Sequence, residues 1–425
     1  MPRPNIVLVI CHDLGRHLGC DGVSSVVSDN IDALAAEGVR MTNHFCTSPG
    51  CSPSRSSIMT GRYPHANGMM GLAHMGWSMH PGERHVAALM SEQGYDTELI
   101  GVQHVTMRPE KLGFRRVRAD RLNCLEAAEV LCGLLRDRAK ESAPFYVQLG
   151  LFEPHRPFDW GGAQPDDARG VWVPRYLLDC PGTRQELAAI QGAIRRVDQA
   201  MATVVRGLLE TGLAENTILI FTTDHGIAFP RAKCTLYDAG IATTLILRWP
   251  AGGWSGGRTV DQLLSNVDLL PTLLEATSAP APRNVQGRSF LALLQGRAYE
   301  PREEVFAEKT WHNGYDPCRA VRTGRYKFIA NFDNTPIEVP TDIMRGPTYA
   351  AMAAGLARNH PPRELYDLKQ DPDELENLAG CPELAEVERD LSARLGRWMR
   401  DTGDPLLEGP IPTPLFWQRI REFNE

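Results

Sequence analysis

The sequence predicts an α/β protein built around a mainly parallel β-sheet that is sandwiched by helices. Three observations lead to this class. Short apolar runs of strand length alternate with longer amphipathic stretches over the first 300 residues. Histidine, aspartate or lysine residues follow several of the apolar runs. Beyond residue 300 the pattern changes to polar turns and short strand-like runs, which predicts a smaller α+β domain with an antiparallel sheet.

The larger domain is predicted to span residues 1–300. The apolar run at 5–10 predicts a buried strand, and the helix expected at 29–38 has a capping residue in Asp29 and a terminating residue in Gly38. The remaining elements are expected in this order: a helix at 85–94, strands at 95–101 and 144–152, one long helix or a helix pair at 184–212, and strands at 216–226 and 243–249. This alternation is typical of parallel strands connected by helices.

The smaller domain is predicted to span residues 301–425, because the alternation stops near residue 300. The segment 320–332 has the pattern of antiparallel strands. The segment 364–380 is polar and rich in turn residues, and a final helix is expected around 383–400.

Composition and charge exclude several classes of protein. Of the 425 residues 43% are hydrophobic and 23% charged, which is typical of a folded globular chain. The formal net charge of −7 argues against a nucleic-acid partner. No apolar run approaches the roughly 20 residues that a membrane-spanning helix needs, so no membrane partner is expected.

The cysteines and the N-terminus bear on the compartment. The ten cysteines include no Cys-x-x-Cys pair, so they predict neither a zinc knuckle nor a disulfide framework. No signal peptide is visible, and a cytoplasmic protein with reduced thiols is expected. A chain trimmed of its export signal would have the same sequence, so this alternative stays open.

Polar residues that follow the predicted strands are expected to form one site. The carboxyl ends of parallel strands in an open α/β sheet lie at the same edge, where ligands bind. A single histidine after a strand is more often structural than functional, but here several strand ends carry such residues. They are His12 and Asp13 after the first strand, His104, His155, then Asp224 and His225, with Lys233 shortly beyond.

The segment CSPSR at 51–55 predicts a cysteine presented at the start of a short helix. Pro53 suits the first helical turn, Ser52 can act as N-cap and Gly61 can end the helix. Cys51 would then stand where backbone N–H groups favour an anion, with Arg55 one turn further on the same face. The alternative is a small buried thiol, which is what most cysteines are.

The segment at 51–55 resembles the Cys-x-Pro-Ser-Arg signature of the sulfatase family within the alkaline-phosphatase superfamily. The resemblance extends over nearly the whole chain, through NIVLVICHDLG at 5–15, TTDHG at 222–226 and ELYDLKQDPDELENLA at 364–379. It implies an alkaline-phosphatase-like fold. Within the family the chain is most similar to the heparan N-sulfatase (sulfamidase) type, on IGVQHV at 100–105 and GIAFPRAKCTLY at 226–237.

The resemblance also implies the catalytic roles. Cys51 is expected to be converted by a formylglycine-generating enzyme to formylglycine, whose hydrated gem-diol attacks sulfur with one oxygen and later expels sulfate with the other. Arg55 and His104 would hold the diol, and Lys233 would bind the sulfuryl oxygens. His155 would protonate the leaving oxygen or nitrogen.

One divalent metal is implied at His12, Asp13, Asp224 and His225. Calcium is the metal that the family resemblance indicates, but the family usually has two aspartates in the first turn and asparagine or histidine after the second. Imidazole ligands shift the expectation toward Mn²⁺ or Zn²⁺, since calcium prefers oxygen ligands. His12 either binds the metal or lies outside its first layer of ligands.

A second departure from the family is Val102, where a sulfate-contacting lysine is common. Loss of one cation from an anion site costs about 2–4 kcal/mol, so either another cation substitutes or activity is low. His65 and His74 are the candidate substitutes. His312 and Arg319 in the smaller domain are further candidate contacts to a sugar or carboxylate.

The predicted function is therefore hydrolysis of a sulfate ester or sulfamate on a small, glycosaminoglycan-type sugar. Two alternatives stay open. One is a phosphodiester or phosphonate monoester hydrolase of the same superfamily, and the other is a catalytically weak sulfoglycan-binding relative, as Val102 suggests. The sequence leaves open the sugar, the choice between N- and O-sulfate, and whether the chain forms a homo-oligomer.

Overall fold

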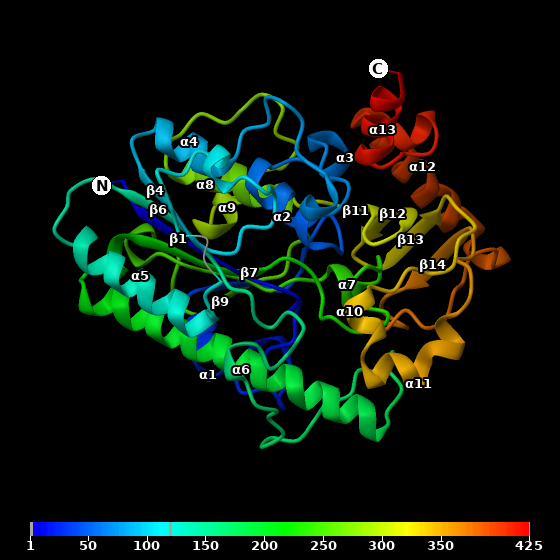
Figure 1. The fold of residues 1–425 in the computed structure, drawn as a ribbon, viewed down its shortest axis with the longest axis horizontal. Helices are drawn as coiled ribbons and strands as arrows, with labels where there is room; N and C mark the ends of the chain where they lie inside the picture. The colour runs from blue at the N-terminus through cyan, green and yellow to red at the C-terminus, as the bar shows by residue number, and fades with distance from the viewer. Residues whose placement is uncertain (1–2, 119–120, 425) are drawn as a thin grey trace.

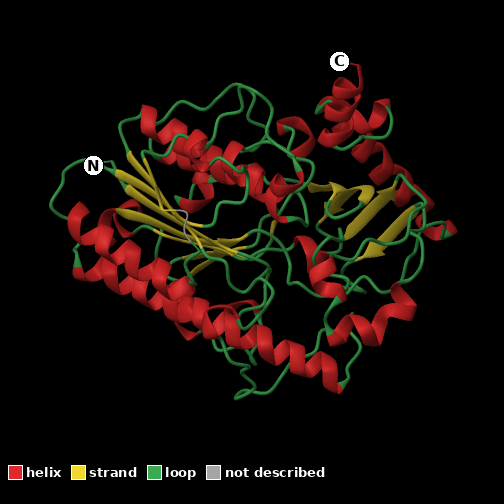
Figure 2. Cartoon of the chain, viewed as in Figure 1, coloured by secondary structure: helices red, strands yellow, loops and turns green. Residues whose placement is uncertain are grey.

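The computed structural model describes residues 3–118 and 121–424 and confirms the predicted α/β class. A large, mainly parallel sheet with helices on both faces lies beside a small antiparallel sheet that carries its own helices (Figures 1 and 2). The domain boundary near residue 300 falls in the connection between α9 (Leu291–Leu294) and β11 (Glu304–Trp311) and stays a prediction.

The large sheet has eight strands in the order β5-β4-β6-β1-β7-β8-β2-β9. They are β1 (Asn5–Cys11), β2 (Val39–Met41), β4 (Asp96–Gly101), β5 (Arg116–Arg118), β6 (Phe145–Gly150), β7 (Thr217–Thr223), β8 (Leu245–Arg248) and β9 (Arg258–Val260). The five strands from β5 to β7 are mutually parallel, whereas β8 runs antiparallel to both β7 and β2. The strands β1, β6 and β7 form the buried centre, as their continuous apolar runs predicted.

Alternate residues of β1 face two separate cores. Val7 and Val9 pack with α1 (Asp29–Glu37), α5 (Cys124–Arg138) and α6 (Pro181–Glu210), which cover one face of the sheet in Figure 1. Ile6, Leu8 and Ile10 pack with the helices of the other face, which are α2 (Cys51–Thr60), α4 (Val86–Glu92), α8 (Leu269–Ala276) and α9. The segment predicted as one helix or two is the single 30-residue helix α6.

The small sheet has the order β11-β12-β13-β14 and is antiparallel throughout. Its further strands are β12 (Tyr315–Thr323), β13 (Tyr326–Asn331) and β14 (Arg363–Asp367). The helix α12 (Ala385–Asp401) packs on it through Leu391, Leu395 and Trp398. The predicted strand segment 320–332 therefore contains parts of two strands, and the polar segment 364–380 begins with a strand that its pattern did not predict.

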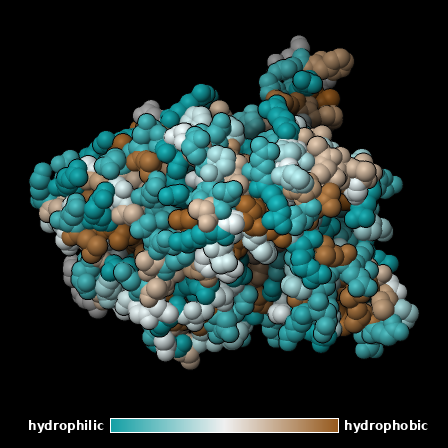
Figure 3. All heavy atoms as spheres, turned by 90° about the horizontal axis from the view of Figure 1, so that it is seen from below, coloured by the Kyte–Doolittle hydropathy of each residue, from teal (hydrophilic) through white to brown (hydrophobic). Residues whose placement is uncertain are grey.

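The remaining elements are short or peripheral. They are β3 (His44–Phe45), β10 (Leu264–Ser265), α3 (Pro64–Asn67), α7 (Asp238–Ile241), α10 (Thr341–Met344), α11 (Pro347–Leu356), α13 (Pro414–Asn424) and several 3₁₀ turns. Within the described part of the chain, no helix combines the length and the apolar character needed to cross a bilayer. The face shown in Figure 3 is mostly hydrophilic, with hydrophobic residues in scattered groups.

Candidate active site

The carboxyl ends of β1 and β7 bring four predicted site residues together. His12 and Asp13 follow β1, and Asp224 and His225 follow β7, which is its direct parallel neighbour. The Asp13 backbone N–H donates to Asp224 Oδ1 at 3.0 Å, and His12 Nδ1 lies 3.2 Å from Asp224 Oδ2. Asp13 has a φ of 47°, a conformation that non-glycine residues rarely adopt and that clusters at functional sites.

The helix α2 presents Cys51 to these residues. The helix begins at Cys51 with Gly50 as its N-cap, so the prediction that Ser52 caps it is wrong; the Ser52 hydroxyl instead accepts a hydrogen bond from the Ala73 N–H. Gly61 ends the helix in the left-handed conformation, as predicted. Cys51 is almost fully buried, and this burial raises the pKa of its thiol well above the ordinary value.

The residues around Cys51 fit a divalent metal. His12, Asp13, Cys51 and Asp224 each offer a ligand atom, and these four atoms lie within 4.8 Å of one another. His225 Nε2 lies 3.2 Å from Asp13 Oδ1 and from the Cys51 sulfur. The buried Nε2 of His12 has no hydrogen-bond partner among the described residues. Two carboxylates with imidazole nitrogens suit Zn²⁺ or Mn²⁺ better than calcium.

Two cationic side chains contact the carboxylates of this candidate metal site. Arg55 Nε donates to Asp224 Oδ2 at 2.9 Å, and Lys233 Nζ donates to Asp13 Oδ2 at 2.8 Å. Burial by itself would raise the pKa of Asp13, but the charges of Lys233 and two nearby histidines hold it below its usual range. Burial likewise opposes the charge of Lys233, yet its anionic neighbours raise its pKa well above normal. The lysine is therefore a fixed positive charge at the site.

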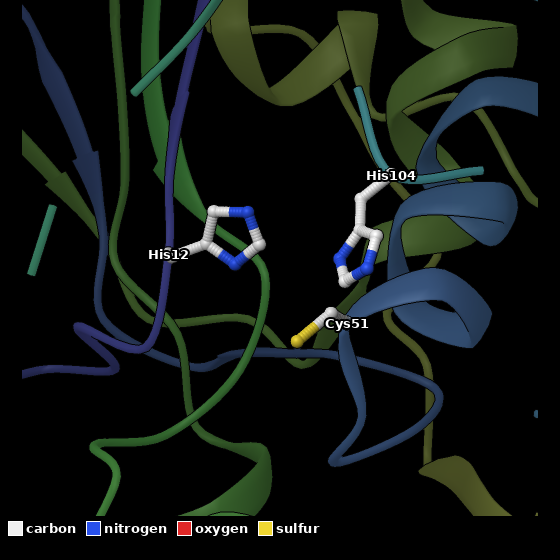
Figure 4. A group of neighbouring side chains, drawn as sticks. All are labelled: His12, Cys51 and His104. Atoms are coloured by element: carbon white, nitrogen blue, oxygen red, sulfur yellow. The ribbon is translucent and has the colours of Figure 1, made fainter. Parts of the chain in front are cut away.

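Two predicted histidines close the site from neighbouring loops. His104 follows β4 and His155 follows β6, with ring centroids 5.5 Å and 5.4 Å from that of His12. In Figure 4 the side chains of His12, Cys51 and His104 lie around one space, with the Cys51 sulfur below the two rings. Burial, then the charge of Lys233, lowers the pKa of His155, and burial lowers that of His104 well below normal. His155 Nε2 lies 3.4 Å from Lys233 Nζ.

The four predicted substrate contacts divide into two pairs. His74 is exposed and stacks on His104 with centroids 5.7 Å apart, and His312 lies beside Gly50 at the start of α2. His65 and Arg319 are buried elsewhere: His65 Nδ1 lies 2.7 Å from a Glu308 oxygen, and Arg319 binds the Asp404 carboxylate with two nitrogens. The structure therefore brings His74 and His312 to the site, whereas His65 and Arg319 are bound to carboxylates of a buried ionic cluster and correct that part of the prediction.

Two features of the site have no counterpart in the sequence reasoning. Asp342, in the short helix α10, places its Oδ2 3.2 Å from Lys233 Nζ. It follows no strand and lies in no motif, so only the tertiary structure reveals it. A cavity of about 520 Å³ opens beside His104 and is lined by Val102, Phe152 and Trp160, so an open, partly aromatic space adjoins Val102.

This fold and this site, with a buried cysteine at a helix start beside residues that fit a divalent metal, are those of a hydrolase. The family description Sulfatase matches residues 4–279, and the description N-sulphoglucosamine sulphohydrolase, C-terminal matches residues 226–349. The chain therefore belongs to the sulfatase family, and it is an enzyme that hydrolyses sulfate esters or sulfamates.

Individual relatives extend over most of the chain. It is 30% identical to an ulvan-active sulfatase of Formosa agariphila, over 97% of this chain and 83% of that one. It is 28% identical to the N-sulphoglucosamine sulphohydrolase of Homo sapiens, over 96% and 92%. A structure solved in complex with its substrate D-glucosamine-2-N,6-O-disulfate shares the fold, with a TM-score of 0.76, 18% identity and coverage of 95% and 98%.

Proposed function

We propose that this sulfatase acts on a small sulfated sugar, through a formylglycine made from Cys51 and with Mn²⁺ or Zn²⁺ as its metal. The observation that carries the proposal is the position of Cys51, which faces Asp13 and His225 at the start of α2. Burial raises the pKa of this thiol, which makes the unmodified side chain a poor nucleophile by itself. Charged and metal-binding side chains surround a thiol that is itself unreactive. Conversion of that thiol to formylglycine explains this arrangement.

The neighbouring side chains supply binding and proton transfer. A bound divalent metal would neutralise charge on the sulfuryl group and activate residue 51. Lys233 offers its ammonium to the sulfuryl oxygens. Nη1 and Nη2 of Arg55, which have no partner in the part of the chain that the structure describes, can hydrogen-bond at residue 51. His155 is close enough to Lys233 to hand a proton to the leaving atom of a sulfate group bound there.

A sugar substrate is supported by the relatives and by the site entrance. The relatives named above are an ulvan-active sulfatase, an N-sulphoglucosamine sulphohydrolase and a protein crystallised with a sulfated glucosamine. The cavity beside His104 contains Phe152 and Trp160 with ring centroids 5.0 Å apart, an apolar surface on which a sugar ring can lie.

Mass spectrometry and turnover test this proposal together. Protein from a host that contains the maturing enzyme should carry an aldehyde at residue 51 and should release sulfate from glucosamine N-sulfate or from an O-sulfated monosaccharide. The Cys51→Ala variant should bind the sugar and release no sulfate. An unmodified thiol in protein that still turns over, or faster cleavage of an aryl phosphate than of the matching aryl sulfate, would contradict it.

A further inference from the structure

Asp342 is a carboxylate that the smaller domain contributes to the active site. It lies in α10, between β13 and β14 of the small sheet, and its side chain is about 25% exposed. Its Oδ2 binds Lys233 Nζ at 3.2 Å. Ligand atoms of Asp342, His155 and Asp13 all lie within 4.8 Å of one another. The carboxylate therefore stands next to the histidine that serves the leaving atom.

The second oxygen of this carboxylate is available to a substrate. Oδ1 of Asp342 makes no hydrogen bond to any residue that the structure describes, whereas Oδ2 is bound to Lys233. Lys233 already has Asp13 as a fully buried counterion at 2.8 Å. A second carboxylate at the same ammonium adds negative charge to a pocket that must receive an anionic sulfate group, so charge balance alone does not explain it.

The chemistry of the leaving atom does explain it. The leaving nitrogen of a sulfamate carries an N–H, which donates to a carboxylate. When an oxygen of the matured residue 51 forms a bond to sulfur, the S–N bond breaks and its electron pair stays on nitrogen. That nitrogen takes a proton from protonated His155, and the free amine takes another from water to become an ammonium ion. The leaving oxygen of a sulfate ester has no hydrogen to donate and ends as a neutral alcohol. A carboxylate at this point therefore stabilises the first reaction and opposes the second.

We propose that Asp342 is a specificity-determining residue that favours sulfamates over sulfate esters by accepting a hydrogen bond from the leaving nitrogen. The inference rests on the proposed activity at Cys51 and adds to it the class of bond that is cleaved. It assigns the smaller domain a direct part in substrate choice, because α10 is the element that carries the carboxylate to Lys233.

The decisive comparison uses two sugars that differ at one atom. Glucosamine N-sulfate and glucose 2-O-sulfate carry the sulfuryl group at the same ring position, on nitrogen in one and on oxygen in the other. In the matured, metal-loaded enzyme, Asp342→Asn should lower kcat/KM for the N-sulfate about 30-fold or more and that for the O-sulfate by less than about threefold. Asp342→Glu, which restores the charge, should recover much of the preference.

A matched control variant comes from the same segment. Glu338→Gln removes a carboxylate that binds Lys309 rather than Lys233, and it should leave the ratio of the two kcat/KM values unchanged. A carboxylate that only positioned Lys233 would affect both sugars equally. If Asp342→Asn lowered kcat/KM equally for the two substrates, or lowered neither value, the inference would be overturned.

A binding measurement separates this inference from the proposed function. Calorimetry at pH 6.5 should show that the unmatured protein binds glucosamine, which is then largely an ammonium ion, at least tenfold more tightly than glucose. Asp342→Asn should abolish that difference. If the wild-type enzyme cleaves neither sugar, the proposed function fails, and the titration still decides the role of Asp342; equal affinities for the two sugars in the wild type would refute it.

Discussion

Two buried arginines show how the active site differs from the buried ionic cluster of His65, Glu308, Arg319 and Asp404. Arg55 and Arg319 are both completely buried. Arg319 donates from all three nitrogens, to the Asp404 carboxylate and to the Lys309 and Cys318 carbonyls. Arg55 donates only from Nε, to Asp224, and its Nη1 and Nη2 have no partner within the described ranges. Arg319 is thus fully hydrogen-bonded, whereas Arg55, which lies beside a cysteine, keeps two donors that no described residue accepts.

This difference teaches how to separate a functional cluster from a structural one. Both clusters contain buried histidines, carboxylates and cations, and the set His65, Glu308 and Asp404 even has the spacing of a metal site. The carboxylates of both clusters accept close hydrogen bonds, so the difference lies in the arginines: every nitrogen of Arg319 is bonded, whereas Nη1 and Nη2 of Arg55 have no partner among the described residues. Unpaired buried polar atoms are costly, so a folded protein retains them where a ligand completes them.

The largest expected effect comes from removing Arg55. Arg55→Met should lower kcat by about 10²–10³-fold, because it removes cationic donors from the reacting centre. The melting temperature of the metal-loaded protein should change by only a few degrees, since Asp224 keeps His12 and the metal as partners. Steady-state kinetics and thermal unfolding measure the two effects. If the variant melted at a much lower temperature but had normal kcat, Arg55 would be a structural residue and not a catalytic one.

Arg319 should behave in the opposite way. Arg319→Met should destabilise the fold by about 3–5 kcal/mol, because it leaves the buried Asp404 carboxylate without its cation. The kcat/KM of the protein that remains folded should stay near the wild-type value. Unfolding in urea measures the loss, and the double variant Arg319→Met with Asp404→Leu should recover part of it. If the variant lost turnover while its stability stayed normal, Arg319 would have a role in the active site after all.

Metal exchange tests whether the histidine ligands of the active site determine which metal it binds. Dialysis against a chelator should lower the melting temperature, and Zn²⁺ or Mn²⁺ should restore it at lower concentration than Ca²⁺ does. His12→Asp exchanges an imidazole for an oxygen ligand and should shift that order toward calcium. Melting curves and elemental analysis provide the readout. A wild-type protein that takes up calcium in preference to zinc would contradict the prediction.

The fold was largely predictable because its central strands are long, apolar runs. β1, β6 and β7 are buried along nearly their whole length, so their sequences are mostly apolar, and the few polar residues, such as Gln148 in β6, do not hide the strand pattern. The strands β2 and β9 have three residues each, which is too short for any periodic pattern. β14 was read as a polar turn because it contains Glu364, whose carboxylate is buried and accepts hydrogen bonds from Tyr237 and Tyr366.

The site was predictable only where its residues follow strands or lie in the cysteine motif. Parallel topology then brings these residues to one edge, which a linear sequence signals through the strand ends. His65 and Arg319 were misjudged by residue type, since their carboxylate partners Glu308 and Asp404 lie 243 and 85 positions away. Asp342 lies 109 positions from Lys233, and no local pattern announces such a contact.

The smallest expected effect concerns His360, which lies between two carboxylates beside the small sheet. His360 Nε2 lies 3.2 Å from Asp316 Oδ1, and Nδ1 lies 3.9 Å from a Glu364 oxygen. Burial opposes its protonation, yet the hydrogen bond to Asp316 and the nearby negative charge of Glu364 raise its pKa from 6.5 to about 9. The folded state therefore holds this proton more tightly than the unfolded state, which contributes on the order of 2 kcal/mol to stability.

The sign of that contribution fixes the pH dependence. The stabilisation is fully present below pH 6.5, where both states are protonated, and it is lost as the pH rises through about 9. His360→Gln should thus lower the melting temperature most at pH 6 and progressively less toward pH 9.5, with kcat/KM unaffected. Thermal unfolding of both proteins across this range measures it. A difference that grows with pH would mean that His360 is neutral in the folded protein.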